Sequence, residues 1–125
     1  MKCLTSLMAL LILLYLPTLQ AASTQEEMAI QDNTDQVNDA LAPCREKYPG
    51  KSFQDRDLGA CSIHALYPLA EQGNYLAAYT IAGTYFGLGY MDETQKWLEY
   101  TLSMDNVPKD IINKVNMRLQ GLSKK

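Results

Sequence analysis

The amino-acid sequence predicts an all-α protein of about five short helices arranged in antiparallel hairpins. Three observations support this prediction. Apolar residues recur three, four and seven positions apart, which places them on one face of a helix. No segment alternates apolar and polar residues over several positions, as a half-exposed strand would. Glycine and proline mark short connections between the apolar segments, and helices joined by short connections pack in opposite directions.

The first 22 residues have the layout of a secretory signal peptide. Lys2 precedes an uncharged apolar run from Leu7 to Leu16, and small residues allow cleavage after Ala21 or Ala22. The run is shorter than the roughly 20 residues that a membrane-spanning helix needs. We therefore expect a periplasmic or secreted protein with no stable membrane anchor after cleavage. An uncleaved N-terminal anchor is the alternative.

Residues 23–33 are polar, and we expect them to form a flexible segment ahead of a single helical domain at 34–122. Residues 123–125 are expected to be a loose tail. The first helix of the domain begins near Thr34, capped by that residue or by the preceding asparagine, and ends before Gly50. Its apolar face consists of Ile30, Val37, Leu41 and Cys44, at spacings of seven, four and three.

The second helix follows a loop over residues 51–57 and spans about 58–72. Asp57 is its expected cap. Pro68 should kink the helix, because proline lacks the N–H that bonds four residues back. The apolar face consists of Leu58, Cys61, Ala65 and Leu69, with Leu66 and Ala70 beside them.

The third helix, about 75–86, follows the helix-stopping sequence EQGN. A short turn leads to the fourth helix, about 93–103, with Asp92 as its cap. The fifth helix, about 109–121, follows Pro108, a residue suited to the first helical position. Its apolar side is formed by Ile111 or Ile112, Val115, Leu119 and Leu122.

Cys44 and Cys61 are the two cysteines that remain once Cys3 is removed with the leader. In an exported chain, two cysteines most simply form one disulfide bond. Sixteen residues lie between them, and closing a loop of that size is worth ~3 kcal/mol in the chain-entropy model. A redox-active pair is the alternative, although the usual spacing for such a pair is C-x-x-C.

Charge and histidine content argue against several classes of function. The chain carries 11 basic and 14 acidic residues, a net charge of −3, and loss of Lys2 makes it −4. With no basic stripe, we expect no nucleic-acid partner. His64 is the only histidine, and Ser62, two residues away, points to a different helix face. We therefore expect no enzyme activity, no metal site and no cofactor.

Residues 75–108 resemble a tetratricopeptide repeat or its Sel1-like relative. The match rests on small, aromatic and apolar positions and a turn glycine, namely Ala78, Ile81, Ala82, Tyr85, Gly89, Leu98 and Leu102. The sequence LAEQGN is similar to the connector between Sel1-like repeats. Thr94 and Thr101 depart from the motif, which has small alanines there. The resemblance implies a right-handed superhelical stack, with residues 44–72 as a degenerate earlier hairpin.

The third helix has two faces with different expected roles. Its small residues should pack against neighbouring helices on both sides, because a single hairpin cannot bury this face alone. Tyr85 and Trp97 fill the edges. By resemblance, the second face lines a peptide-binding groove, and tyrosine suits a contact surface because it offers large area at little entropy cost. The candidate binding residues are Leu76, Tyr79, Gly83 and Phe86. The alternative is that these four residues pack against the final helix.

These observations favour an exported helical-repeat adaptor that binds a protein or peptide partner in the bacterial envelope. An immunity or inhibitor protein that neutralises a toxic periplasmic enzyme is the alternative. Because some cysteine-containing Sel1-like proteins are linked to binding of cell-wall fragments or β-lactams, an enzyme is the third hypothesis. The sequence identifies no partner, and it leaves the oligomeric state, including self-association, open.

Overall fold

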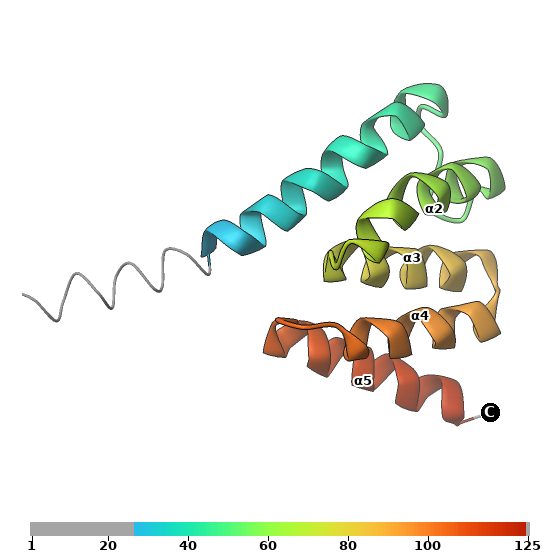
Figure 1. Cartoon of the computed structure of the whole chain (residues 1–125). Helices are drawn as coiled ribbons and strands as arrows, with labels where there is room; N and C mark the ends of the chain where they lie inside the picture. Colours follow the sequence, from blue (N-terminus) through green and yellow to red (C-terminus); the bar gives the residue numbers. More distant parts are fainter. Residues whose placement is uncertain (1–26, 125) are drawn as a thin grey trace, which may run out of the picture. The chain divides into compact units, whose positions relative to one another are not determined.

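The computed structural model describes residues 27–124, and over this range it contains five helices and no strand, which confirms the all-α class. The predicted signal peptide, Cys3 and residues 23–26 lie outside the described residues. By its contacts the chain divides after Asp32. Residues 27–32 are helical and exposed. From Asn33 onward, α2 to α5 follow one another, each antiparallel to its neighbour (Figure 1).

The first helix covers residues 27–47 and is called the N-terminal helix below. It is already formed seven residues before Thr34, so Asn33 and Thr34 lie within it and do not cap it. The residues ahead of Thr34 include glutamate, glutamine, methionine and alanine, which have high helix propensity and extend the helix. Of the predicted apolar face, Val37, Leu41 and Cys44 are buried, whereas Ile30 is 40% exposed.

The second helix, α2 (Arg56–Glu71), is capped by Asp55 and not by Asp57. Oδ1 of Asp55 accepts hydrogen bonds from the backbone N–H groups of Asp57 and Leu58, at 3.1 and 3.0 Å. Aspartate is a favourable N-cap residue at either position. Asp55 is the cap because its side chain reaches two free backbone N–H groups. α2 continues through Pro68 to Glu71. Its most buried positions are Leu66 and Ala70.

Helices α3 (Tyr75–Leu88) and α4 (Met91–Ser103) form a hairpin with only two residues between them. Gly89 has a φ of +86°, the left-handed conformation that ends a helix. α4 begins directly after this turn, so Asp92 lies in its first turn and does not cap it. There its carboxylate stabilises the helix N-terminus through the helix dipole.

The last helix, α5 (Lys109–Ser123), has Pro108 as its cap residue, whereas the sequence suggested this proline for the first helical position. The helix extends to Ser123, which the sequence assigned to a loose tail. The predicted apolar side is confirmed, because Val115 is fully buried and Ile111, Leu119 and Leu122 pack beside it.

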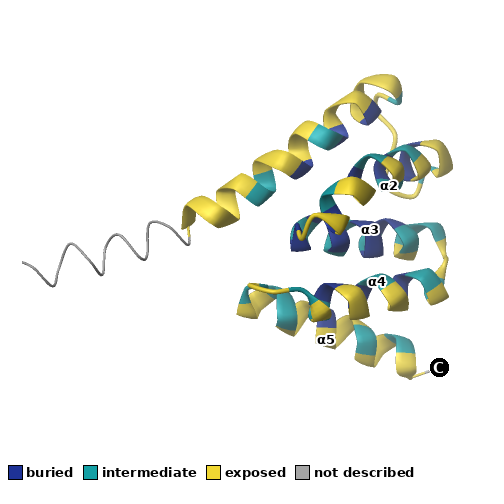
Figure 2. Ribbon diagram, viewed as in Figure 1, coloured by how far each residue is buried: buried dark blue, intermediate teal, exposed yellow. Residues whose placement is uncertain are grey.

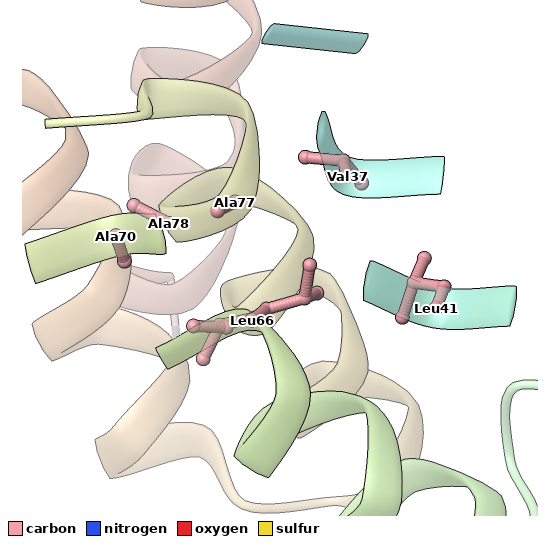
Figure 3. Packing of buried hydrophobic residues seen from close by; sticks show 7 residues of the cluster. Val37, Leu41, Leu66, Ala70, Ala77 and Ala78 are labelled. Carbon is pink, nitrogen blue, oxygen red and sulfur yellow. The ribbon is translucent and has the colours of Figure 1, made fainter. Parts of the chain in front are cut away.

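Two apolar clusters lie on opposite sides of α3. The first joins the N-terminal helix, α2 and α3, and Figure 3 shows Val37 and Leu41 directed toward Leu66 and the alanines of α3. The second joins α3, α4 and α5. Figure 2 shows the buried residues on the helix sides that face one another. The clusters consist of Val37, Leu41, Leu66, Ala70, Ala77, Ala78 and Ile81, and of Ala82, Leu98 and Val115. The expected covering of α3 from both sides is confirmed.

Three buried threonines occupy positions in the seams between helices. The hydroxyls of Thr84, Thr94 and Thr101 each donate to the carbonyl four residues earlier, at 2.8 Å. No buried side-chain nitrogen or oxygen within residues 27–124 lacks a hydrogen-bond partner. Thr94 and Thr101 therefore fit where the repeat motif has alanine, because each satisfies its hydroxyl within its own helix.

The Cys44–Cys61 disulfide bond is confirmed, and the two Cα atoms lie 5.8 Å apart. It joins the N-terminal helix to α2. Among the helices of the described range, none has both the length and the apolar character needed to cross a membrane.

Candidate functional site

The four residues predicted to bind a partner do not share one environment. Leu76 packs against the first apolar cluster, and Tyr79 packs against the second. Phe86 is 53% exposed. The Arg118 guanidinium of α5 lies 5.0 Å from the centre of the Tyr79 ring. Within this face, Tyr79 is therefore packed against α5.

Gly83 also lies against α5. A Cβ atom built at this position would lie 3.6 Å from Nη1 of Arg118, an ordinary contact distance. Tyr79 and Gly83 therefore share Arg118 as a neighbour. For Tyr79 and Gly83, this arrangement agrees with the alternative interpretation, in which the face packs against the final helix. The role of all four residues in binding stays a prediction.

A second surface, not predicted from the sequence, lies between α2 and α4. α2 contributes a stripe of residues at spacings of three and four, which lie along one face of the helix. α4 contributes a shorter stripe with the same spacings. These stripes consist of Arg56, Ala60, Ile63, His64, Tyr67 and Glu71 on α2, and of Glu93, Lys96, Trp97 and Tyr100 on α4. Because both helices are antiparallel to α3, they run in the same direction as each other.

Two open hollows occupy this surface. The first, of about 460 Å³, lies between the first part of the α2 stripe and the side chains of Tyr85, Leu88 and Tyr90. The second, of about 390 Å³, lies between the end of the α2 stripe and the α4 stripe. Tyr67 lines both hollows, so they adjoin. We call the two hollows together the aromatic groove.

Edge-to-face contacts organise the rings of the groove. The Trp97 ring centre lies 5.7 Å from that of Tyr67 and 5.4 Å from that of Tyr100, with interplanar angles of 76° and 84°. Tyr85 and Tyr90 form a similar pair, at 6.2 Å and 88°. Such geometry places the positive edge of one ring against the negative face of another, and each pair is worth about 0.5–1.5 kcal/mol beyond its buried area.

Polar contacts hold the walls of the groove in place. The Tyr100 hydroxyl donates to the carbonyl of Ala70 at 3.2 Å, which ties α4 to the end of α2. Asn74 caps α3 by accepting from the N–H of Ala77 at 3.1 Å. Its amide nitrogen also donates to the carbonyl of Asn33 and to Oε1 of Gln36, at 3.2 and 3.1 Å. These bonds fix the start of α3 against the N-terminal helix.

The floor of the first hollow depends on a close approach between α2 and α3. A Cβ atom at Gly59 would lie 2.9 Å from Cδ1 of Leu88, which is too close for carbon atoms. Glycine at this position therefore lets the Leu88 side chain sit against the α2 backbone. Leu88 in turn lines the first hollow.

The groove presents charged groups at both ends and hydroxyl groups between them. Arg56 stands at the start of the α2 stripe and Glu71 at its end, and both are exposed. Lys96 pairs with Glu93, with Nζ 3.5 Å from Oε1. Burial, followed by the negative charge of Glu93, raises the pKa of the Tyr85 phenol above its ordinary value of 10.0. The Tyr85 hydroxyl therefore keeps its proton at neutral pH.

The chemistry of the groove is suited to binding. His64 lines the first hollow beside Arg56 and Tyr67. Within residues 27–124, no group of three or more histidine, cysteine, aspartate or glutamate side chains is placed to hold a metal ion. Aromatic rings, two end charges and phenolic hydroxyls supply contact area and hydrogen bonds.

Comparison of the chain with protein-family models, with curated proteins and with solved structures gives no match.

Proposed function

We propose that the protein is an exported adaptor that binds a protein or peptide partner through the aromatic groove. One observation carries the proposal: five aromatic rings meet in edge-to-face pairs beside two open hollows. Three of these rings, Tyr67, Tyr90 and Tyr100, are 40–49% exposed. Tyrosine and tryptophan are the residues most often found at the energetic centres of protein interfaces.

The rigidity of the walls supports the proposal. A binding surface that is already ordered loses less side-chain entropy on association, so more of its contact energy appears as affinity. The disulfide bond, the hydrogen bonds of Asn74 and the Tyr100–Ala70 bond all restrict the helices that carry the groove.

The proposal includes a tetratricopeptide- or Sel1-like organisation of the helices. In this organisation the N-terminal helix and α2 are one hairpin, α3 and α4 are the next, and α5 closes the stack. Packed neighbouring helices, the two-residue turn at Gly89 and the buried alanines of α3 support it. The aromatic groove then lies along the second helices of the two hairpins.

Export is also part of the proposal. A disulfide bond is typical of proteins that fold in an oxidising compartment. The charge, apolar run and small residues of the first 22 positions support the same destination.

Site-specific photo-crosslinking tests the adaptor proposal. A photoreactive phenylalanine analogue is introduced separately at Tyr67, Phe86 and Met117 in the full-length protein, expressed in its native cells. These positions are 48%, 53% and 71% exposed, so the probe is accessible at each of them. Tyr67 reports on the aromatic groove, Phe86 on the predicted face of α3, and Met117 on α5 as a control.

We expect a discrete crosslinked protein partner from position 67 and none from position 117. Crosslinks from position 86 alone would move the site to the α3 face and keep the adaptor function. No protein crosslink from either position 67 or position 86, in cells that carry the oxidised protein, would overturn the adaptor proposal.

A further inference from the structure

We infer that the aromatic groove binds a proline-rich peptide segment in the polyproline II conformation, with an acidic group at one end of the segment and a basic group at the other. This inference rests on the proposed adaptor function and names the chemical class of its ligand. It follows from three properties of the groove: its walls, its rings and its end charges.

The walls argue against a β-strand as the ligand. An added strand gains affinity by pairing its backbone with an exposed sheet edge. α2 and α4 are helices whose backbone groups bond within the helix, apart from those at the ends. A ligand in this groove must therefore be bound through side-chain contacts and side-chain hydrogen bonds.

The rings favour proline. A polyproline II segment has no internal backbone hydrogen bonds, so its carbonyl groups are free to accept hydrogen bonds. The hydroxyls of Tyr67 and Tyr90 and the Trp97 indole N–H are donors of the required kind, while the Tyr100 hydroxyl donates to Ala70. Proline rings pack against aromatic side chains in grooves of this type, and the preformed conformation keeps the entropy cost low. Tyr67 and Trp97 meet where the two hollows adjoin.

The length of the groove matches a short peptide. Arg56 and Glu71 are fifteen positions apart on α2. At about 1.5 Å per residue, these positions are separated by roughly 22 Å along the helix axis. A polyproline II segment advances about 3.1 Å per residue, so about seven residues span this distance.

The end charges set the direction of the ligand. Arg56 is positive at one end of the groove and Glu71 is negative at the other, while Lys96 and Glu93 pair between them. A ligand with an acidic group near Arg56 and a basic group near Glu71 gains attraction at both ends. The reversed ligand meets like charges at both ends, which costs affinity and gives specificity.

Peptide selection on the purified, oxidised protein tests the inference. A display library of random ten-residue peptides is selected on the immobilised protein, and enriched sequences are synthesised for affinity measurements. We expect enriched peptides with two or more prolines, flanked by an acidic residue on one side and a basic residue on the other. Enrichment of sequences without excess proline, or no enrichment at all, would overturn the inference.

Three variants locate the binding site. Tyr67→Ala removes the ring shared by both hollows and should weaken binding by about tenfold or more, the scale of an interface hot spot. Met117→Ala removes an exposed apolar side chain of α5, outside both the groove and the predicted face of α3, and should leave affinity unchanged. Equal binding to wild type and Tyr67→Ala, with far-UV circular dichroism showing both folded, would contradict the assignment.

The third variant exchanges the end charges. Arg56→Glu combined with Glu71→Arg preserves the net charge and changes two exposed positions, so the fold is retained. This protein should prefer peptides with the acidic and basic ends exchanged. An unchanged preference would show that Arg56 and Glu71 do not set the direction of the ligand.

The outcomes separate this inference from the adaptor proposal. A protein crosslinked at Tyr67, together with a library that yields no proline-rich peptides, removes only the polyproline ligand. Binding of a cell-wall oligosaccharide that Tyr67→Ala abolishes, with no peptide selected, would instead assign the groove to a carbohydrate.

Discussion

The first two hairpins of the domain are closed in different ways. Residues 48–55 connect the N-terminal helix to α2, and the Cys44–Cys61 bond joins the two helices. Only two residues connect α3 to α4, and this pair is held by Ala82 and Leu98, both fully buried in the second cluster. The difference shows two ways of holding a pair of helices together. A disulfide bond holds the hairpin with the long connection, and close packing holds the hairpin with the tight turn.

This comparison also explains the placement of the core. Small residues on α3 allow close approach on both sides, so α3 carries residues of both apolar clusters. The N-terminal helix contributes the buried Val37 and Leu41 to the first cluster, with Ala40 packed beside them. A hairpin with few core residues gains more from a crosslink, because the crosslink restricts the unfolded chain independently of packing.

The largest effect is expected from Leu98→Ala, which removes the main α4 side chain of the second cluster. Leu98 is fully buried, and truncation of such a leucine costs roughly 3–5 kcal/mol. Small domains are stable by only about 5–15 kcal/mol, so this variant should be close to unfolding. Urea denaturation measures the change. Met117→Ala, at a position 71% exposed, is the control and should be neutral.

The next effect is expected when both disulfide cysteines are replaced by alanine. The loss should be ~3 kcal/mol, and it should fall mainly on the first hairpin. Hydrogen exchange should show increased opening in the N-terminal helix and α2, while α3 to α5 keep their protection. Uniform loss of protection across all helices would show that the two hairpins are not closed independently.

The smallest effect is expected from a pair of glycine substitutions. Gly89 and Gly50 both have positive φ, +86° and +74°, and an added Cβ meets nothing within 4 Å at either position. Gly89→Ala should cost about 1 kcal/mol, because a two-residue turn cannot move away from the left-handed conformation. Gly50→Ala should cost less, because the longer connection can relax. Equal losses in thermal denaturation would contradict this difference.

Much of the fold follows from local sequence signals. The helices from α2 to α5, the buried face of α3 and the disulfide pair were predicted. These features depend on the spacing of apolar residues and of cysteines that lie close together in the sequence. The predicted caps Asp57 and Asp92 were wrong by two residues. At both sites the helix begins before the predicted cap. The cap residues are Asp55 and Tyr90, so each predicted aspartate lies in the first helical turn.

The aromatic groove could not be predicted in the same way. Tyr67 and Trp97 are thirty positions apart, on helices that are not consecutive in the chain. Their contact depends on the rotation of α2 and α4 about their axes, which the packing on α3 determines. Trp97 was expected only to fill an edge, and it also lines the groove. The stripe from Arg56 to Glu71 was present in the sequence, but it mixes charged, apolar and aromatic residues and does not match an amphipathic pattern.

Gly59 influences the shape of the first hollow through its close approach to the Leu88 side chain. A single methyl group added there would collide with the Leu88 side chain, whose terminal carbons lie 2.9 and 3.3 Å from that position. Leu88 would then have to change its rotamer, and the shape of the first hollow would change with it. If the groove binds a ligand as we propose, a single substitution at Gly59 changes its selectivity through Leu88, while every ring and every charge of the groove stays in place.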